Sequence, residues 1–324
     1  MKILLVRPAP TDETIGLQHV MIVEPLELEV LGATVGPDDT VEIVDYILDQ
    51  TPLERVLRRA RPDLVGVTGY ITNVPAMIEL CRRAKAHDAR LKTVVGGVHC
   101  EVCPEHLDHP AIDFRVVRNA AVVFPSLLDH LKGKGPLPPG VLQPGDVVVP
   151  EELPPFDFHV PLPDRRLTRR YRDQYFYIFH DKVALIKTAF GCPFQCTFCF
   201  CRAITGHRYH ARPLDEVMRE LRQIEAREIY IVDDDFFISR ERARAILDAL
   251  RQERLGKRYL VYGRADFIAD NPDLMAELKE VGLRTVIIGF ESFRPRDLDG
   301  FNKRTEVAQN ERAMRVCNSL GIDV

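Results

Sequence analysis

Short apolar runs alternate with amphipathic stretches along residues 1–132, and this alternation restricts the fold more than any other feature. The runs are rich in β-branched residues and end at Gly, Pro or Asp, which is typical of buried parallel strands. Strands are predicted over 3–6, 41–47, 64–68, 93–98 and 114–117. Helices are predicted over 25–35, 52–60, 74–87 and 124–131. The pattern therefore predicts an α/β fold with a Rossmann-like, doubly wound open sheet.

A proline-rich segment interrupts this pattern at residues 133–180. Proline fixes φ and offers no amide donor, so this segment is predicted to be an extended linker rather than a packed element. The alternation then resumes over 181–324. Strands are predicted over 183–188, 228–232, 259–263 and 284–290, and helices over 213–225, 240–254, 272–281 and 306–320. Four successive β/α units are typical of part of a barrel. Because residues 321–324 resemble the start of a fifth strand, we expect a barrel that is incomplete at its C-terminal end.

The charge balance limits the class of partner. Lys and Arg total 44 against 48 Asp and Glu, a net charge of −4, which excludes a strongly basic nucleic-acid binder by bulk charge. A local arginine run between Arg165 and Arg172 either grips phosphates or forms a solvated stretch between domains, and we expect no DNA partner. No apolar run approaches the ~18 residues of a membrane span. Arg7 interrupts the stretch that a signal peptide would continue, which predicts a cytoplasmic protein.

The cysteines at 192, 196 and 199 form the sharpest motif, Cys-x3-Cys-x2-Cys, directly after a predicted strand. Three thiolates at this spacing can each reach a different iron of a 4Fe–4S cluster, and the fourth iron is then open to a ligand. The alternative is structural zinc, with His207 or His210 as a fourth ligand. Cys201 is interpreted as a core or loop thiol, with a role as an additional ligand as its alternative.

Together with Phe198, this motif resembles the cluster motif of the radical S-adenosylmethionine (SAM) superfamily. The resemblance continues at three later strand ends: an acidic run at 231–236, an arginine segment at 262–266 and a Gly-x-Glu-Ser-like segment at 288–292. It implies that Cys192, Cys196 and Cys199 hold a 4Fe–4S cluster, and that Phe198, Asp234, Arg264 and Glu291 contact SAM. An arginine fork suits the SAM carboxylate. A plain salt bridge for Arg264 and an unliganded strand-end carboxylate for Glu291 are the alternatives.

The first half of the chain resembles the B12-binding domains of that superfamily. Residues 94–99, Val-Val-Gly-Gly-Val-His, look like their Val-Gly-Gly-x-His segment, and 67–70 and 153–157 look like two further family segments. The resemblance implies that cobalamin is held by Thr68, Gly69, Tyr70, Gly96, Gly97 and His99. Paired glycines let the backbone approach a bulky ligand. A Rossmann-like domain with a purely structural role is the alternative.

Two departures from that pattern are visible. The chain has no Asp-x-His-x-x-Gly, so no histidine is placed to ligate cobalt from below, and 118–121 replace the usual Gly-Glu-Gly-Glu.

Cys100 and Cys103 form a Cys-x2-Cys pair, which we interpret as loop cysteines. Zinc binding, redox chemistry and contact with the corrin ring are its alternatives.

The resemblance implies an enzyme that cleaves SAM to a 5′-deoxyadenosyl radical with an electron from a flavodoxin- or ferredoxin-type donor. With cobalamin, the implied reaction is methylation of an unactivated carbon. The alternatives are an oxidative cyclase or rearrangement enzyme, and an inactive fragment or a cobalamin- or cluster-binding sensor. Neither the substrate nor a catalytic residue follows from the sequence.

Overall fold

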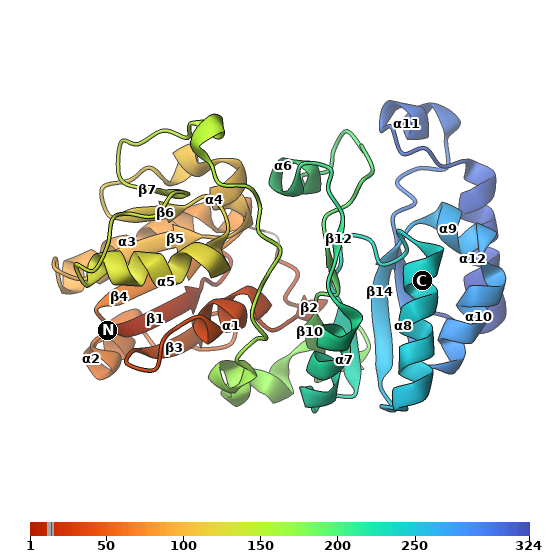
Figure 1. Ribbon diagram of the computed structural model, residues 1–324, viewed down its shortest axis with the longest axis horizontal. Helices are drawn as coiled ribbons and strands as arrows, with labels where there is room; N and C mark the ends of the chain where they lie inside the picture. The colour runs from red at the N-terminus through yellow and green to blue at the C-terminus, as the bar shows by residue number, and fades with distance from the viewer. Residues whose placement is uncertain (12–13, 15) are drawn as a thin grey trace. The chain divides into compact units, whose positions relative to one another are not determined.

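Each half of the chain builds its own sheet of parallel strands (Figure 1). The computed structural model describes residues 1–11, 14 and 16–324. These divide into two units, Met1–Ile178 and Phe179–Val324. Each unit has its own clusters of buried apolar side chains. None of the described helices is long and apolar enough to cross a membrane.

The sheet of the first unit has the strand order β3-β1-β4-β5-β6-β7. Its strands are β1 (Lys2–Arg7), β3 (Thr40–Asp45), β4 (Leu64–Thr68), β5 (Lys92–Gly96), β6 (Phe114–Val116) and β7 (Val141–Leu142). All pair in parallel except β7, which is antiparallel to β6. In chain order the parallel strands follow the 2-1-3-4-5 arrangement of flavodoxin-like sheets. The doubly wound sheet predicted from the sequence is confirmed.

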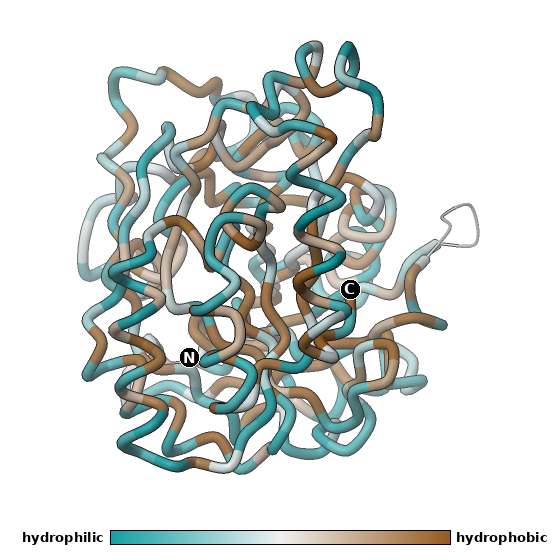
Figure 2. Tube along the Cα trace, turned by 90° about the vertical axis from the view of Figure 1, so that its right-hand side faces the viewer, coloured by the Kyte–Doolittle hydropathy of each residue, from teal (hydrophilic) through white to brown (hydrophobic). Residues whose placement is uncertain are grey.

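Helices cover both faces of this sheet. Alternate residues of β1 point to opposite faces, so Ile3 and Leu5 join one core cluster and Leu4 and Val6 join the other. The first cluster packs under α1 (Leu26–Ala33) and α5 (Ala120–Leu131), and the second under α2 (Leu53–Ala60) and α3 (Val74–His87). Hydrophilic and hydrophobic residues alternate along the helices (Figure 2), as expected where one side of each helix is buried.

Strand β5 ends two residues earlier than predicted. The sequence predicted a strand over 93–98, but Gly97 has φ +93°, which ends the extended run and starts the short helix α4 (Val98–Val102). The 3-10 helix η1 (Ile71–Asn73) follows β4, and a second one, η2 (Pro104–Leu107), follows α4. This geometry brings the segment after β5 back toward the sheet edge.

The proline-rich segment contributes to the fold of the first unit. It forms β7, η3 (Pro150–Glu152), η4 (Arg165–Gln174) and β8 (Phe176–Tyr177), and β8 pairs with β2 (Met21–Ile22). Arg115 donates to the carbonyl oxygens of Gln143 and Asp146 at 2.7 and 2.8 Å. Prolines exclude this segment from helix interiors and central strands, but they permit a short edge strand tied down by side chains.

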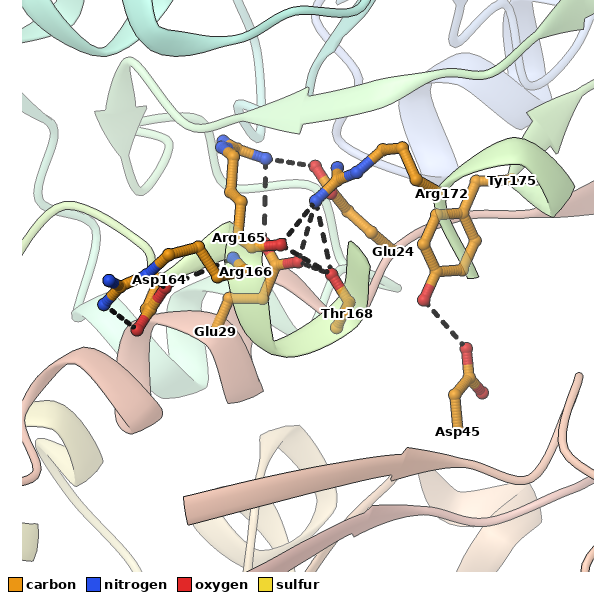
Figure 3. A network of polar contacts seen from close by, with 9 residues as sticks. All are labelled: Glu24, Glu29, Asp45, Asp164, Arg165, Arg166, Thr168, Arg172 and Tyr175. Carbon is orange, nitrogen blue, oxygen red and sulfur yellow. Dashed lines mark hydrogen bonds and ion pairs between the residues drawn. The ribbon is translucent and has the colours of Figure 1, made fainter. Parts of the chain in front are cut away.

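A buried polar network joins η4 to α1 and to Glu24, which lies two residues before α1 (Figure 3). Arg165 and Arg172 both form ion pairs with Glu24, and the Thr168 hydroxyl donates to Glu29. Both carboxylates are buried. Arg165 and Arg172 therefore stabilise the packing of η4 against α1. This differs from the solvated stretch that the arginine run was expected to form. Arg166 of the same run is exposed.

The sheet of the second unit is parallel, with the order β10-β13-β14-β15. Its strands are β10 (Ala184–Ile186), β13 (Glu228–Ile231), β14 (Arg258–Gly263) and β15 (Leu283–Ile288). The longer helices are α7 (Leu214–Gln223), α8 (Arg240–Glu253), α10 (Pro272–Glu280) and α12 (Val307–Leu320). Asp323 bridges in parallel to Thr285, where a fifth strand was predicted to start. Sequential neighbours in one parallel sheet agree with the predicted partial barrel.

Helix α8 shows why these segments are helical. The Ser239 side chain caps the first turn by accepting from the Arg242 N–H, and Ala243, Ile246 and Leu250 recur on one buried face. The helix ends at Arg254 with φ +51°. The remaining short elements are β9 (His180–Asp181), β11 (Ala189–Phe190), α6 (Cys201–Thr205), β12 (His210–Ala211), α9 (Ala265–Asp270) and α11 (Pro295–Gly300).

Candidate cofactor-binding sites

The three cysteines of the motif lie on a loop that follows β10 and β11 in the second unit. β11 pairs antiparallel with β12 and closes this loop at its base. Gly191 starts the loop with φ +77°, and a Cβ there would lie 2.0 Å from the carbonyl oxygen of Arg208. Only glycine fits this turn without displacing the backbone. The cysteine loop, residues 191–200, therefore begins at a position fixed by backbone geometry.

Contacts from a second turn hold the middle of the cysteine loop. The Thr197 N–H donates to the Phe301 carbonyl oxygen at 3.0 Å, and Asn302 Nδ2 donates to the Gln195 carbonyl oxygen at 2.8 Å. Phe198 is exposed, and its ring meets that of Phe301 edge-on with centroids 5.7 Å apart. The backbone of the loop is thus anchored while the Phe198 ring stays accessible.

The donor set of the loop suits a cluster better than a single ion. Cys196 is buried, and Cys192 and Cys199 are partly exposed. Among the described residues, the only group of three metal-ligating side chains with donor atoms within 4.8 Å of one another lies elsewhere, so these thiols do not converge on one point. Neither His207 nor His210 joins such a group in the described part of the chain. Thiolates that each bind a different iron of a cube do not need to converge.

Neighbouring groups affect the thiols of the loop unequally. Burial raises the pKa of Cys192 to about 11. A hydrogen bond with the Cys201 thiol lowers the pKa of Cys199 to about 6. The Cys201 sulfur also lies 3.3 Å from Asp234 Oδ1, so its single hydrogen has two neighbouring acceptors. Cys201, the first residue of α6, therefore contacts both a motif cysteine and a strand-end carboxylate.

Three successive aspartates follow β13 and have different surroundings. The carboxylate of Asp233 is buried and accepts from the N–H groups of Thr188 and Ala189 at 2.6 and 3.0 Å, which fixes the strand end before the cysteine loop. Asp234 accepts from the Gly191 N–H at 2.8 Å and lies 3.4 Å from Lys187 Nζ. Both contacts are with residues at the start of the cysteine loop. Asp234 therefore lies next to the cysteines and stabilises the backbone of their loop.

Asp235 was not selected from the sequence, yet it is the aspartate that has a carboxylate oxygen without a hydrogen-bond partner among the described residues. It is buried and accepts from the Phe237 N–H at 2.9 Å through Oδ1, while its Oδ2 has no hydrogen-bond partner among the described residues. Burial raises its pKa to about 7. A buried carboxylate oxygen without a partner is costly unless a ligand supplies a donor. Strand alternation, which puts 233 and 235 on one side and 234 on the other, is the signal that could have found it.

Arg264 follows β14 and is buried. Its guanidinium forms an ion pair with Asp266 at 2.9 Å, donates to the Lys303 carbonyl oxygen at 2.8 Å and lies 3.8 Å from the ring centre of Phe194 on the cysteine loop. A pocket beside it is lined by Phe194, Phe237, Ile238, Arg264, Asp266, Phe267, Asp270 and Asn271. The planar fork is thus oriented by stacking and hydrogen bonds next to an open pocket.

Glu291 follows β15 with a left-handed backbone, φ +61°. Its Oε1 lies 3.0 Å from Nζ of Lys303, which is buried. Lys303 is a second residue that the sequence did not single out as a ligand; only its place in the turn after the Glu-Ser segment pointed to it. Asp234, Arg264 and Glu291 therefore follow carboxyl ends of strands in one parallel sheet, where such sheets bind ligands. Phe198 lies on the loop that follows β10 of the same sheet and the short strand β11.

The six residues predicted to hold cobalamin gather at two neighbouring strand ends of the first unit. Thr68 pairs in register with Gly96, and a Cβ on Gly97 would lie 2.5 Å from Thr68 Oγ1 and 3.2 Å from the Gly69 nitrogen. The His99 N–H donates to the Gly69 carbonyl oxygen at 3.4 Å. Tyr70 is exposed beside them. The paired glycines form a cradle of bare backbone beside Thr68 and Gly69, and an alanine at Gly97 would collide with those two residues.

Residues 118–121, which replace Gly-Glu-Gly-Glu, have a structural role. Asn119 adopts φ +54°, its Nδ2 donates to the Pro155 carbonyl oxygen at 2.7 Å, and its Oδ1 accepts from the Asp157 N–H at 2.8 Å. Asn119 thereby fixes residues 153–157, the family-like bridge, to the sheet edge.

Comparison with known proteins decides the family. Residues 15–128 match the B12 binding domain, and residues 186–324 match the radical SAM superfamily. This chain is a B12-binding radical SAM protein. A radical SAM domain implies a 4Fe–4S cluster and SAM, and a B12-binding domain implies cobalamin. The cysteine donor set, the unpartnered oxygen of Asp235 and the glycine cradle fit these three groups.

Known proteins are similar to this chain over its whole length. This chain is 30% identical over its whole length to the hopanoid C-3 methylase of Methylococcus capsulatus and spans 64% of that protein. It is 26% identical to the hopanoid C-2 methylase of Rhodopseudomonas palustris and spans 60% of it. The solved structure of the cobalamin-dependent SAM radical enzyme OxsB, with aqua-cobalamin and SAM bound, superposes with a TM-score of 0.76 at 18% identity, covering 99% of this chain and 48% of that one. The chain therefore spans about half to two thirds of these proteins.

Proposed function

We propose that this protein is a cobalamin-dependent radical SAM methyltransferase that acts on an unactivated carbon. The observation that carries the proposal is the meeting of the cysteine loop, Asp235, Arg264 and Glu291 at the carboxyl ends of one sheet, in a chain that also holds the Gly96-Gly97 cradle. The names of the similar proteins, two hopanoid methylases, support methyl transfer. They do not select a substrate for this chain.

Each predicted residue has a role in the proposal. Cys192, Cys196 and Cys199 hold the cluster, and the backbone around Phe198 faces the adenine of SAM. Arg264 binds the SAM carboxylate through its fork, and Glu291 and Asp234 bind other polar groups of SAM. We add Asp235, whose free buried oxygen suits the SAM ammonium group or a ribose hydroxyl. When bound, the cluster supplies the electron that cleaves SAM and cobalamin supplies the methyl group.

In the first unit, Thr68, Gly69, Tyr70, Gly96, Gly97 and His99 line the cobalamin site in this proposal. The domain assignment in this proposal is a B12-binding domain over 1–132, a connecting segment over 133–180 that belongs to the first unit up to residue 178, and a radical SAM core over 181–324. A flavodoxin- or ferredoxin-type donor supplies electrons. We also propose a cytoplasmic location, because all eight cysteines are unpaired and thiols persist in reducing compartments.

The first test measures 5′-deoxyadenosine. The protein is purified without oxygen, reconstituted with iron and sulfide, and given SAM and a strong reductant. We expect 5′-deoxyadenosine from the parent and none from a Cys192→Ala, Cys196→Ala, Cys199→Ala variant. Cys317→Ala, a buried cysteine on α12 outside the loop, is the matched control and should retain activity. A cluster without SAM cleavage would support a sensor instead, and absence of a cluster would contradict the proposal.

The second test follows the methyl group. With hydroxocobalamin and SAM that is isotopically labelled on its methyl group, a methyltransferase passes the label to an accepted substrate. A product without label would instead favour oxidative cyclisation or rearrangement. Cobalamin binding itself is read from its absorbance on the protein, and loss of that binding in Gly97→Ala would support the cradle.

A further inference from the structure

A separate group of metal-ligating side chains lies in the first unit. His99, Cys103 and His106 each bring a donor atom, and these atoms all lie within 4.8 Å of one another. Nε2 of His99 and Nδ1 of His106 are 3.1 Å apart. In the described part of the chain no other three His, Cys, Asp or Glu residues meet this closely. The spacing is His-x3-Cys-x2-His.

The backbone brings these three residues together before any ion binds. His99 lies on α4 and Cys103 directly follows this helix, one turn later, and the Cys103 N–H donates to the His99 carbonyl oxygen at 2.8 Å. The helix ends at Cys103, and the His106 N–H donates back to the Cys103 carbonyl oxygen at 3.2 Å. Arg115 fixes this corner by donating to the Pro104 carbonyl oxygen at 3.1 Å. The ligands therefore sit on a preformed corner rather than on a free loop.

The surroundings of the group leave one side open. His99 is buried, Cys103 is partly exposed and His106 is exposed. In the absence of a metal, one imidazole must donate a hydrogen to the other across the 3.1 Å contact. A bound cation replaces that shared hydrogen and takes lone pairs from both rings.

We propose that His99, Cys103 and His106 form a zinc site with three protein ligands and an open fourth position. Two imidazoles and one thiolate are a donor set that Zn²⁺ prefers, and three protein ligands with one open position are the pattern of accessible zinc sites. Binding releases the proton of the Cys103 thiol. The side chain of His99 then faces the metal, and its contribution to the cobalamin cradle comes from the backbone. The site does not depend on SAM cleavage or on methyl transfer.

The test uses the full chain with Cys192→Ala, Cys196→Ala and Cys199→Ala, so that the cluster cysteines cannot capture zinc. The metal-depleted protein is titrated with Zn²⁺ by equilibrium dialysis and with Co²⁺, whose visible absorbance reports thiolate ligation. We expect one zinc per chain and a cobalt–thiolate band. Cys103→Ser should abolish the band, and Cys103→Ser or His106→Asn should weaken zinc binding by at least about tenfold.

The matched control is His109→Asn, a histidine on the same loop that is not in the group. Its Nδ1 accepts from the Ala111 N–H at 3.1 Å, a role that the asparagine oxygen can keep, so zinc affinity should not change. Melting curves of each variant without metal verify that the fold is retained. Zinc affinity that is equal in the parent and Cys103→Ser, or equally lost in His109→Asn, would overturn the site.

Discussion

At the scale of single residues, two glycines set where the cofactor loops can lie. Gly191 and Gly97 both have positive φ, and at both a Cβ would meet atoms of another segment at 2.5 Å or less. The first fixes the start of the cysteine loop, and the second fixes the turn after β5. Their positions beside the two candidate sites mean that small substitutions should act on cofactor binding more than on folding.

We expect Gly191→Ala to lose cluster binding. The left-handed conformation costs a non-glycine residue about 1–2 kcal/mol, and the clash with the Arg208 carbonyl oxygen adds to this cost by shifting the loop. Cluster affinity should fall by about tenfold or more. Iron and sulfide content after anaerobic reconstitution measures the effect.

Gly256→Ala is the control for that variant. Gly256 has φ +65° but nothing within 4 Å of an added Cβ, so it carries the same conformational cost without the clash. Its iron content should match the parent even if its melting temperature falls. Equal iron loss in both variants would mean that the cost is global and not local to the loop.

The sequence located most candidate residues of the second unit, because ligand residues follow strands and strands are visible as apolar runs. It did not separate Asp233, Asp234 and Asp235. Alternation groups 233 with 235, but which one lacks a partner depends on Thr188, Ala189 and Phe237, which lie on other segments or the following turn. Contacts between segments distant in sequence are outside what a local pattern can predict.

At the scale of elements, a buried network of charged side chains connects α1 and η4. Glu24 and Glu29 are held by Arg165, Arg172 and Thr168 in a region without solvent (Figure 3). Burial, and after it the charge of Glu24, raises the pKa of Glu29 to about 8. The native state therefore holds a proton on Glu29 that the unfolded chain releases at a lower pH.

This predicts that stability falls as pH rises. The contribution of Glu29 is full below its ordinary pKa of 4.5 and is lost as pH rises through about 8. Between about pH 6 and about pH 9, the free energy of unfolding should fall on the order of 1–3 kcal/mol more in the parent than in Glu29→Gln, which cannot ionise. Urea unfolding at the two pH values measures the difference.

Glu42→Gln is the matched substitution for this comparison. Glu42 is a partly exposed partner of Arg59 and Arg170, so its loss should leave the pH profile unchanged. A Glu29→Gln profile parallel to that of the parent would contradict a proton held on Glu29.

Elements with a strong period were predicted well, and those held by distant contacts were not. The helix predicted over 74–87 is observed over the same residues. In contrast, the strand predicted over 93–98 ends at Gly96, and η4 was not predicted. Helix η4 has no apolar stripe of its own: Thr168 and Tyr171 are its buried residues, and its order derives from ion pairs with residues more than a hundred positions earlier.

At the scale of the whole molecule, the first unit extends to Ile178. The sequence placed the end of that domain at 132, whereas the contacts of Leu167, Tyr171 and Tyr175 place residues up to 178 with it. Tyr175 is fully buried.

We therefore expect a polypeptide of residues 1–178 to unfold cooperatively and to be more stable than one of residues 1–132. Burying large apolar side chains contributes about 1.5–3 kcal/mol each, so the difference should be on the order of 3–5 kcal/mol. Urea unfolding followed by circular dichroism measures it. Equal stability of the two polypeptides would mean that residues 133–178 are a tether only.

The same segment has a further effect on how the protein behaves among other copies of itself. Strand β7 covers the outer side of β6, and at the opposite side of the sheet Arg170 of η4 donates to the Ile43 carbonyl oxygen on β3 at 2.9 Å. A bare sheet edge is a template for strand addition by another chain, and short strands, prolines and charges suppress it. Residues 133–178, whose sequence suggests a spacer, thus contact both edge strands of the sheet and protect it from aggregation. Removing these residues would expose both edges at once.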